Sequence, residues 1–299
     1  MYTKNVPSIS RIFKGFGLHF LWYAPYVTAV YVAYAYLGFK NIDIKMSIAT
    51  VLGFAVALLL GFRTSASYDR WWEARKIWGG IINESRTLVR QTIGFIDQDT
   101  ISDEVRQMAY YQIAWCISLK NSLRNLNPLD GVEVFLSNAE IAALQGKSNV
   151  PSEILKLQTK LNAGFKKRGE IDSFQFVSID QTMKDLCTHM GKAERIKKTV
   201  FPTQYRSYTH KGVIIFTIML PFGMLFSTGP LVVLICLLVS FFFNMLENIA
   251  YYLQDPFMNR ASDIPMTSIC RTIEINIKEL LEEKDIPEAI MPDEKGVLM

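Results

Sequence analysis

Long apolar runs near the start of the chain restrict what it can fold into. Residues 18–39 contain no Asp, Glu, Lys or Arg, and residues 44–62 contain only Lys45, at the edge of the run. A helix needs about 20 mostly apolar residues to cross the hydrocarbon core of a membrane. Each run has about that length, so the sequence predicts two membrane-spanning helices joined by a short turn.

A second apolar region starts at residue 213. Residues 213–246 are uncharged and too long for a single untilted crossing, but Ser227-Thr228-Gly229-Pro230 interrupts them. Gly-Pro after two polar residues is typical of a turn. We therefore expect two more crossings, at about 213–226 and 231–250. The predicted fold class is an all-α membrane protein with four transmembrane helices in two hairpins. A hydrophobic content of 50% and a charged content of 20% agree with this class.

The residues outside the two hairpins predict a large helical region. Residues 63–210 contain helix-start signals at Ser102-Asp103-Glu104 and at Pro151, and a further helical pattern over 174–200. A last helix is expected over 263–283, opened by Asp263-Ile264-Pro265. Its apolar residues share one face, and they are Ile269, Ile273, Ile277 and Leu281.

The sequence contains no sign of a second, independently folded domain. We therefore expect one domain over residues 1–283. The Pro- and charge-rich residues 284–299 are expected to form a flexible C-terminal tail.

Basic residues gather on one side of the predicted hairpins. They are Lys4, Arg11 and Lys14 before the first span, Arg63, Arg70, Arg75 and Lys76 after the second, and Arg195, Lys197, Lys198, Arg206 and Lys211 before the third. Positive charge stays on the cytoplasmic side, so we expect a multi-pass protein with an inner-membrane-like topology, with both termini and residues 63–210 cytoplasmic. Topology then accounts for most of the net charge of +4, which is no sign of a nucleic-acid partner. A cleavable signal peptide is not expected, because the first apolar run is too long and lacks a small-residue cleavage site.

Catalytic and metal-binding patterns are scarce. The four cysteines are far apart, and the sequence has no phosphate-binding glycine loop and no nucleophile elbow. His189 follows Asp185 and Cys187 closely enough to ligate a metal in principle, but an ordinary polar helix face explains this spacing more simply. We therefore expect no enzyme activity, no cofactor and no metal site. The lack of a catalytic cluster disfavours a lipid-modifying enzyme.

Two stripes of residues run side by side along the second predicted span at a spacing of four. The small stripe is Ala49, Gly53, Ala57 and Gly61, and the large stripe is Phe54, Leu58 and Phe62. Four residues advance about 400° around a helix, so each stripe is expected to stay roughly on one face. Small residues let helices approach closely in lipid. The large stripe then faces a neighbouring helix, the lipid, or a narrow axial hole, and the last arrangement would make a pore.

The order of motifs resembles that of the bestrophin family, and most closely its bacterial members. Leu60-Gly61-Phe62 ends the first hairpin, and Arg70-Trp71-Trp72-Glu73 begins eight positions after Phe62. The later motifs are Pro202-Thr203-Gln204-Tyr205 before the second hairpin, then Asp255-Pro256-Phe257 and Asp263-Ile264-Pro265. The resemblance covers about residues 8–283.

The resemblance implies a homopentameric ion channel with a pore along the fivefold axis. In that family, three residues of the second membrane helix at four-residue spacing line a narrow hydrophobic neck, and these correspond to Phe54, Leu58 and Phe62. A second, cytoplasmic constriction corresponds to Phe201, where family members more often carry a smaller aliphatic residue. Rings of apolar side chains block ions by dewetting. The expected partners are four further copies of the chain, membrane lipid and permeant small ions.

The Arg70-Trp71-Trp72-Glu73 motif is expected to support the neck and the subunit contacts. Trp and Arg are common anchors where a helix leaves the membrane. Arg70 can also stack on an indole ring or pair with Glu73. We interpret these residues as structural.

The sequence leaves the permeant ion open. Hydrophobic rings do not select the sign of charge, and Arg63, Asp69 and Glu73 all lie near the neck. We expect chloride or other small anions; the alternatives are a cation-conducting channel or a non-conducting membrane sensor or adaptor. Animal bestrophins carry a cluster of acids that holds calcium, whereas residues 258–263 here contain one acid and one base. Calcium needs 6–8 oxygen ligands, so we expect no calcium gating of the animal type.

Overall fold

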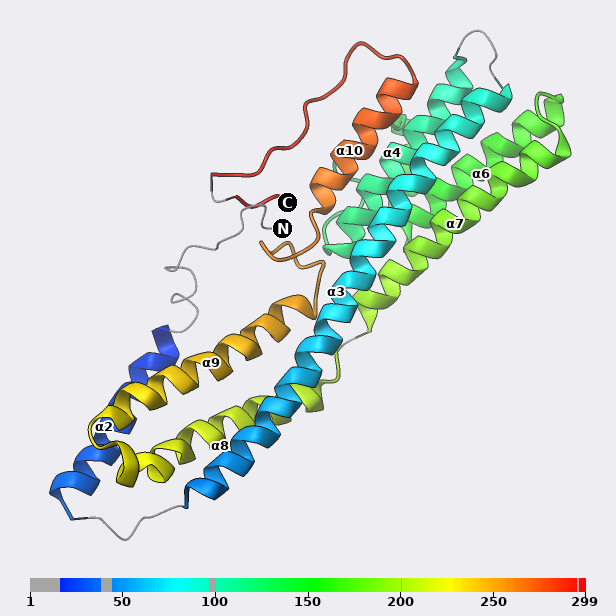
Figure 1. Ribbon diagram of the computed structural model, residues 1–299. Helices are drawn as coiled ribbons and strands as arrows, with labels where there is room; N and C mark the ends of the chain where they lie inside the picture. The colour runs from blue at the N-terminus through cyan, green and yellow to red at the C-terminus, as the bar shows by residue number, and fades with distance from the viewer. Residues whose placement is uncertain (1–16, 39–44, 97–100, 200, 295) are drawn as a thin grey trace. The chain divides into compact units, whose positions relative to one another are not determined.

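The computed structural model describes the chain apart from residues 1–16, 39–44, 97–100, 200 and 295 (Figure 1). All regular elements of the described residues are helices, and there is no β-strand among them. The helices are α2 (Gly17–Tyr36), α3 (Met46–Ile96), α4 (Asp103–Leu123), α5 (Asn138–Leu144), α6 (Val150–Arg168), α7 (Ser173–Lys198), α8 (Thr203–Thr228), α9 (Leu231–Leu253) and α10 (Met266–Leu280). The expectation of an all-α protein is confirmed.

Three helices in the described part of the chain are long and apolar enough to cross a membrane, namely α3, α8 and α9. The remaining expected span, the first along the chain, corresponds to α2. This helix has 20 residues and does not reach the same level of hydropathy. Its tyrosines, together with Pro25, lower its mean hydropathy. The count of four spans therefore stays a prediction.

The second predicted span does not end at residue 62. It continues without a break as α3, a single helix of 51 residues. From Arg63 onward, polar residues make the helix suited to water instead of lipid, but its backbone conformation stays helical. Even the adjacent glycines Gly79 and Gly80 lie inside the helix. A glycine costs a helix only about 1 kcal/mol, which tertiary packing offsets.

Other elements also differ from the prediction, and α8 begins at Thr203, ten residues before the span expected over 213–226. The short helix α5 was not expected; its N-cap Ser137 forms a capping box with Glu140. Helix α10 begins at Met266, later than the expected Asp263. The carboxylate of Asp263 does not cap this helix, because it accepts a hydrogen bond of 3.0 Å from the backbone N–H of Arg260 instead.

Part of the predicted topology lies outside the described residues. Lys4, Arg11 and Lys14, which contributed to the expected orientation, belong to this part. So do Phe39, the expected end of the first span, and Ile44, the expected start of the second.

The chain forms two compact units, and α3 contributes to both. Among the described residues, the hairpin unit comprises those within 17–71 and 201–255, and the bundle unit comprises those within 72–199 and 256–299. The hairpin unit therefore contains the apolar helices, and the bundle unit contains the charged ones.

In the hairpin unit, α8 packs against α9, and α2 packs against both. The first part of α3 joins them through glycines that let the helices approach closely. A Cβ at Gly53 would lie 2.7 Å from the ring of Phe216 in α8, and one at Gly212 would lie 3.3 Å from Val56. The hydroxyl of Tyr23 donates a 2.8 Å hydrogen bond to the Thr217 carbonyl, which ties α2 to α8.

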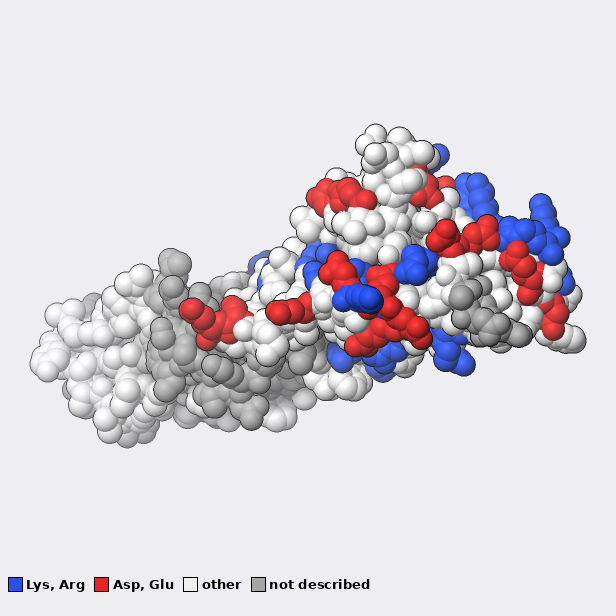
Figure 2. Space-filling model, turned by 90° about the horizontal axis from the view of Figure 1, so that it is seen from above, with Lys and Arg blue, Asp and Glu red and all other residues white. Residues whose placement is uncertain are grey.

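In the bundle unit, α4 packs against α6 and α10, and α6 packs against α7. The core is apolar, with Trp78 and Trp115 fully buried. It also holds a polar chain, in which Gln112 donates to Ser85 at 2.8 Å and accepts from Gln158 at 2.9 Å. On the face shown in Figure 2, Lys, Arg, Asp and Glu side chains are intermixed over this unit.

The residues after α10 form no further helix in the described part. Hydrogen bonds hold the end of this segment: the Ser268 N–H donates to the Met299 carbonyl at 2.8 Å, and the Asp293 N–H donates to the Val297 carbonyl at 3.0 Å. The expected flexibility of residues 284–299 stays a prediction.

Gly53 tests the close approach of α3 and α8. We predict that Gly53→Ala lowers the stability of the hairpin unit by about 1–3 kcal/mol, because the new methyl group overlaps the buried Phe216 ring. The measurement is the thermal unfolding midpoint of the protein in detergent. Gly61→Ala is the matched control, since a Cβ there meets nothing within 4 Å. Equal midpoints for the two variants would contradict the prediction.

His189 on α7 gives the bundle unit a pH dependence. Burial lowers the pKa of His189 below its ordinary value of 6.5, Lys192 lowers it further, and Asp185 opposes them. The unfolded chain then binds the proton more readily than the folded one, so stability is lost as pH falls below about 6.5. We predict that His189→Gln reduces the fall of the thermal midpoint between about pH 7.5 and pH 5.5. If the pH dependence of the thermal midpoint is the same in His189→Gln as in the wild type, His189 is not its cause.

Candidate functional site

The three residues of the large stripe all lie on the exposed side of α3 within the hairpin unit. The exposed fractions of Phe54, Leu58 and Phe62 are 70%, 48% and 61%. At about 100° per residue, the three span about 80° of the helix circumference. The structure therefore brings them together on one open apolar face.

The packed side of α3 lies opposite this face. Its residues are buried and recur every three or four positions, and they are Ala49, Gly53, Val56, Leu60, Arg63 and Ser67. Their mean direction is about 180° from that of the stripe. One side of α3 is thus used for packing within the subunit, and the other is left for contacts that a single chain does not supply.

The small stripe does not stay on one face. Ala49 and Gly53 are buried, whereas Ala57 and Gly61 are exposed. Each step of four residues advances about 40° beyond a full turn, so the row drifts by about 120° over three steps. Only its first half contributes to the packing with α8.

Arg63 directly follows the stripe in sequence but lies on the packed side of the helix. It is fully buried, and its Nη1 lies 3.5 Å from the Glu247 carboxylate on α9. The first charged residue after Phe62 on the exposed face is Asp69, which is exposed. The first charge along the open face beyond the stripe is therefore negative, a point that the sequence left open.

The Arg70-Trp71-Trp72-Glu73 residues have separate local partners. The ring of Trp71 stacks on that of Tyr68, with 6.1 Å between centroids, and Glu73 pairs with Lys76 at 2.8 Å. Arg70 is half-buried, and Trp72 is 46% exposed. Their role in supporting the neck stays a prediction.

Phe201, the residue expected at the second constriction, is half-buried just before α8. Its ring centroid lies 6.3 Å from that of Tyr205. The Tyr205 hydroxyl donates a 3.0 Å hydrogen bond to the Leu59 carbonyl, which ties the start of α8 to α3 beside the stripe. The constriction itself stays a prediction.

The sequence reasoning missed Glu247 and its partner His210. The ring Nδ1 of His210 on α8 lies 2.9 and 3.1 Å from the two carboxylate oxygens of Glu247. A signal was present, since Glu247 is an acid inside the span predicted at 231–250. Ionisable residues within membrane spans are costly and often functional.

The described residues hold no group of three or more His, Cys, Asp or Glu side chains that could bind a metal ion. His189, described with Asp185 on α7, therefore belongs to no such group. The four cysteines are free, and only Cys187 is exposed.

A family model of bacterial and fungal bestrophin proteins matches residues 10–279. This chain belongs to the bacterial and fungal bestrophin family. The resemblance predicted from the motifs is confirmed, and the match extends over both units.

Two named relatives match most of the length of this bestrophin. It is 30% identical over 289 residues to the voltage-dependent anion channel-forming protein YneE of Escherichia coli strain K12, a match that covers 95% of this chain and 91% of that protein. It is 29% identical over 245 residues to the voltage-dependent anion channel-forming protein mll4386 of Mesorhizobium japonicum, covering 82% of this chain and 77% of that one.

The fold agrees with a solved structure. The crystal structure of a bacterial bestrophin homologue from Klebsiella pneumoniae matches with a TM-score of 0.85 and 26% identity, over 90% of this chain and 99% of that chain. Together with the apolar helices, these relatives make this bestrophin a membrane protein.

Proposed function

We propose that this bestrophin is the subunit of a homopentameric ion channel that conducts chloride or other small anions. The observation that carries the proposal is the division of α3 into a packed face and an exposed apolar face with Phe54, Leu58 and Phe62 along it. An apolar face of this kind fits a pore neck made by several copies. The names of the relatives, which are channel-forming proteins rather than enzymes, support anion conduction.

The gate of the proposed channel consists of three successive rings of Phe54, Leu58 and Phe62. Five apolar side chains in a ring offer nothing that replaces the hydration shell of an ion, so a narrow ring dewets and blocks conduction. A small rotation or dilation of the five α3 helices then restores water. Phe201 forms a second constriction on the cytoplasmic side, and Arg70, Trp71, Trp72 and Glu73 support the neck.

The proposed topology has four spans, with both termini on the cytoplasmic side of the inner membrane. Helix α2 is the one of the four that does not reach the hydropathy of a typical span, but three of its polar side chains have hydrogen-bond partners. Tyr23 and Tyr26 donate hydrogen bonds of 2.8 Å to the carbonyls of Thr217 and Ile218, and Thr28 donates to Ala24 within the helix. A helix whose polar groups are satisfied internally is compatible with the bilayer.

Cation conduction is the second candidate, and Asp69 favours it. Five Asp69 carboxylates on the exposed face of α3 would place negative charge beyond the neck. The buried Arg63, paired with Glu247, does not offset this charge on the same face.

Leu58 tests the gate. We predict that Leu58→Ala raises open probability or single-channel conductance several-fold in planar bilayers, because a wider and less apolar ring dewets less readily. Leu59→Ala is the matched control: Leu59 is also exposed, at 40%, but points about 100° away from Leu58. A channel with unchanged currents in Leu58→Ala would remove this residue from the gate.

The permeant ion is tested by the reversal potential of the purified protein in a potassium chloride gradient. We expect reversal towards the chloride potential. For Asp69→Asn we predict a further shift in that direction, because the exposed face loses its negative charge. Reversal of the wild type towards the potassium potential would establish the cation candidate instead, and a shift in Asp69→Asn towards potassium would exclude Asp69 as a vestibule charge.

A further inference from the structure

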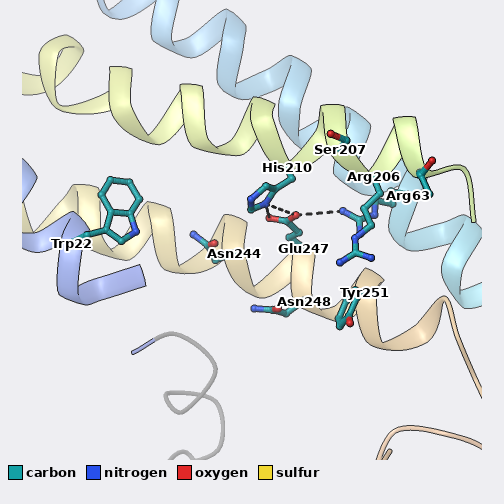
Figure 3. Close-up of a pocket in the computed structure, with 10 residues that line it drawn as sticks. Trp22, Arg63, Arg206, Ser207, His210, Asn244, Glu247, Asn248 and Tyr251 are labelled. Carbon is teal, nitrogen blue, oxygen red and sulfur yellow. Dashed lines mark hydrogen bonds and ion pairs between the residues drawn. The ribbon is translucent and has the colours of Figure 1, made fainter. Parts of the chain in front are cut away.

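A cavity of about 780 Å³ lies within the hairpin unit, on the side of α3 away from the Phe54–Phe62 stripe. Its charged and polar lining comes from three helices: Arg63 of α3, Arg206, Ser207 and His210 of α8, and Glu247 and Asn248 of α9. Figure 3 shows Arg63, Arg206 and His210 close to Glu247. The volume lies in the range of about 300–1,000 Å³ that is typical of small-molecule sites.

The spacing of the lining residues explains why they meet. Arg206 and His210 are four residues apart on α8, and Asn244 and Asn248 are four apart on α9, so each pair shares one face of its helix. On α9 these polar residues interrupt an otherwise apolar sequence. Polar groups on a membrane-type helix are costly, so where they occur they commonly pair with one another or mark a functional site.

Arg63 is the residue that points to a ligand. Its side chain has no exposed surface, yet no described group accepts a hydrogen bond from its Nε, Nη1 or Nη2. The ion pair with Glu247 spans 3.5 Å and lacks the geometry of a hydrogen bond. The ion pair compensates the charge of the buried guanidinium but leaves its N–H groups without hydrogen-bond acceptors, which is costly, and an anion bound in the cavity would supply them.

Glu247 does not supply the missing acceptor. Both of its oxygens lie within 3.1 Å of His210 Nδ1, so the carboxylate is oriented towards His210, and its contact with Arg63 is the longer one at 3.5 Å. Two guanidinium groups and one carboxylate leave the lining with a charge of +1 when His210 is neutral. The second guanidinium, of Arg206, lies over the ring of Tyr251 at 4.4 Å, which holds it beside the cavity.

We propose that this cavity binds a phosphate group, held by Arg63 and Arg206. Guanidinium groups bind phosphate through two parallel hydrogen bonds, and the Ser207 hydroxyl and Asn248 amide add neutral donors. The phosphate belongs either to a lipid headgroup or to a free phosphate compound. The site is separate from the stripe that lines the proposed pore, and its occupancy does not depend on conduction.

Arg206→Gln in the full-length protein in detergent is the main test, because Arg206 is exposed and its loss leaves the buried core intact. The matched control is Lys211→Gln, which removes the same charge from the same helix at an exposed residue that does not line the cavity. Inorganic phosphate is titrated by calorimetry, and phosphatidylglycerol retained from vesicles containing it is measured by native mass spectrometry.

We expect Arg206→Gln to weaken binding about tenfold and Lys211→Gln to change it less than about twofold. Retention of phosphatidylglycerol without binding of inorganic phosphate would assign a lipid headgroup, and the reverse would assign a free phosphate compound. The proposal is overturned if neither probe binds, or if the two variants weaken binding equally. Arg63→Lys is a second variant, and it should also weaken binding, because lysine lacks the planar pair of donors.

Discussion

The close packing of α3 on α8 is the constraint on which the rest of the hairpin unit depends. Gly53 lies directly beneath the Phe216 ring, and Gly212 lies against Val56, so the two helices touch with little side-chain volume between them. In a membrane, where lipid tails are as apolar as leucine, such close contact is a main source of helix association. Because this contact fixes which side of α3 faces inward, it also fixes which side faces out. The exposure of Phe54, Leu58 and Phe62 is therefore a consequence of how α3 packs.

The same contact between α3 and α8 places apolar and charged side chains on opposite sides of α3. Phe62 and Arg63 are neighbours in sequence, but one lies on the open apolar face and the other is buried near Glu247 and the polar side chains of α8 and α9. An arginine that lined the proposed pore would give the neck a fixed positive charge. Placed on the opposite side, it adds nothing to that surface and takes part in a separate polar cavity. Family membership and the apolar face support a channel, whereas we propose that its ion preference depends on residues such as Asp69, farther along the helix.

Local sequence was sufficient for part of this structure. The common face of Phe54, Leu58 and Phe62 could be predicted, because side-chain direction on a helix depends only on the number of intervening residues. The motif order around Arg70 and Asp255 was sufficient for the family. The packed face could not be predicted, since it depends on Phe216, more than a hundred residues away. The length of α3 was also missed, because a change from apolar to polar residues marks the membrane surface and not the end of a helix. Glu247 could have been found, since it interrupts a predicted span.

The four-residue spacing of the stripe has a geometric consequence for the proposed neck. A row of residues at i, i+4 and i+8 is inclined to its helix axis by about 26°. Three rings can share one central axis only if each α3 is inclined to that axis by roughly this angle. The five α3 helices would then surround the axis with the same tilt. In such an arrangement Phe54, Leu58 and Phe62 cannot change radius independently. A change in tilt alters all three rings together, which makes opening a concerted twist of the five subunits.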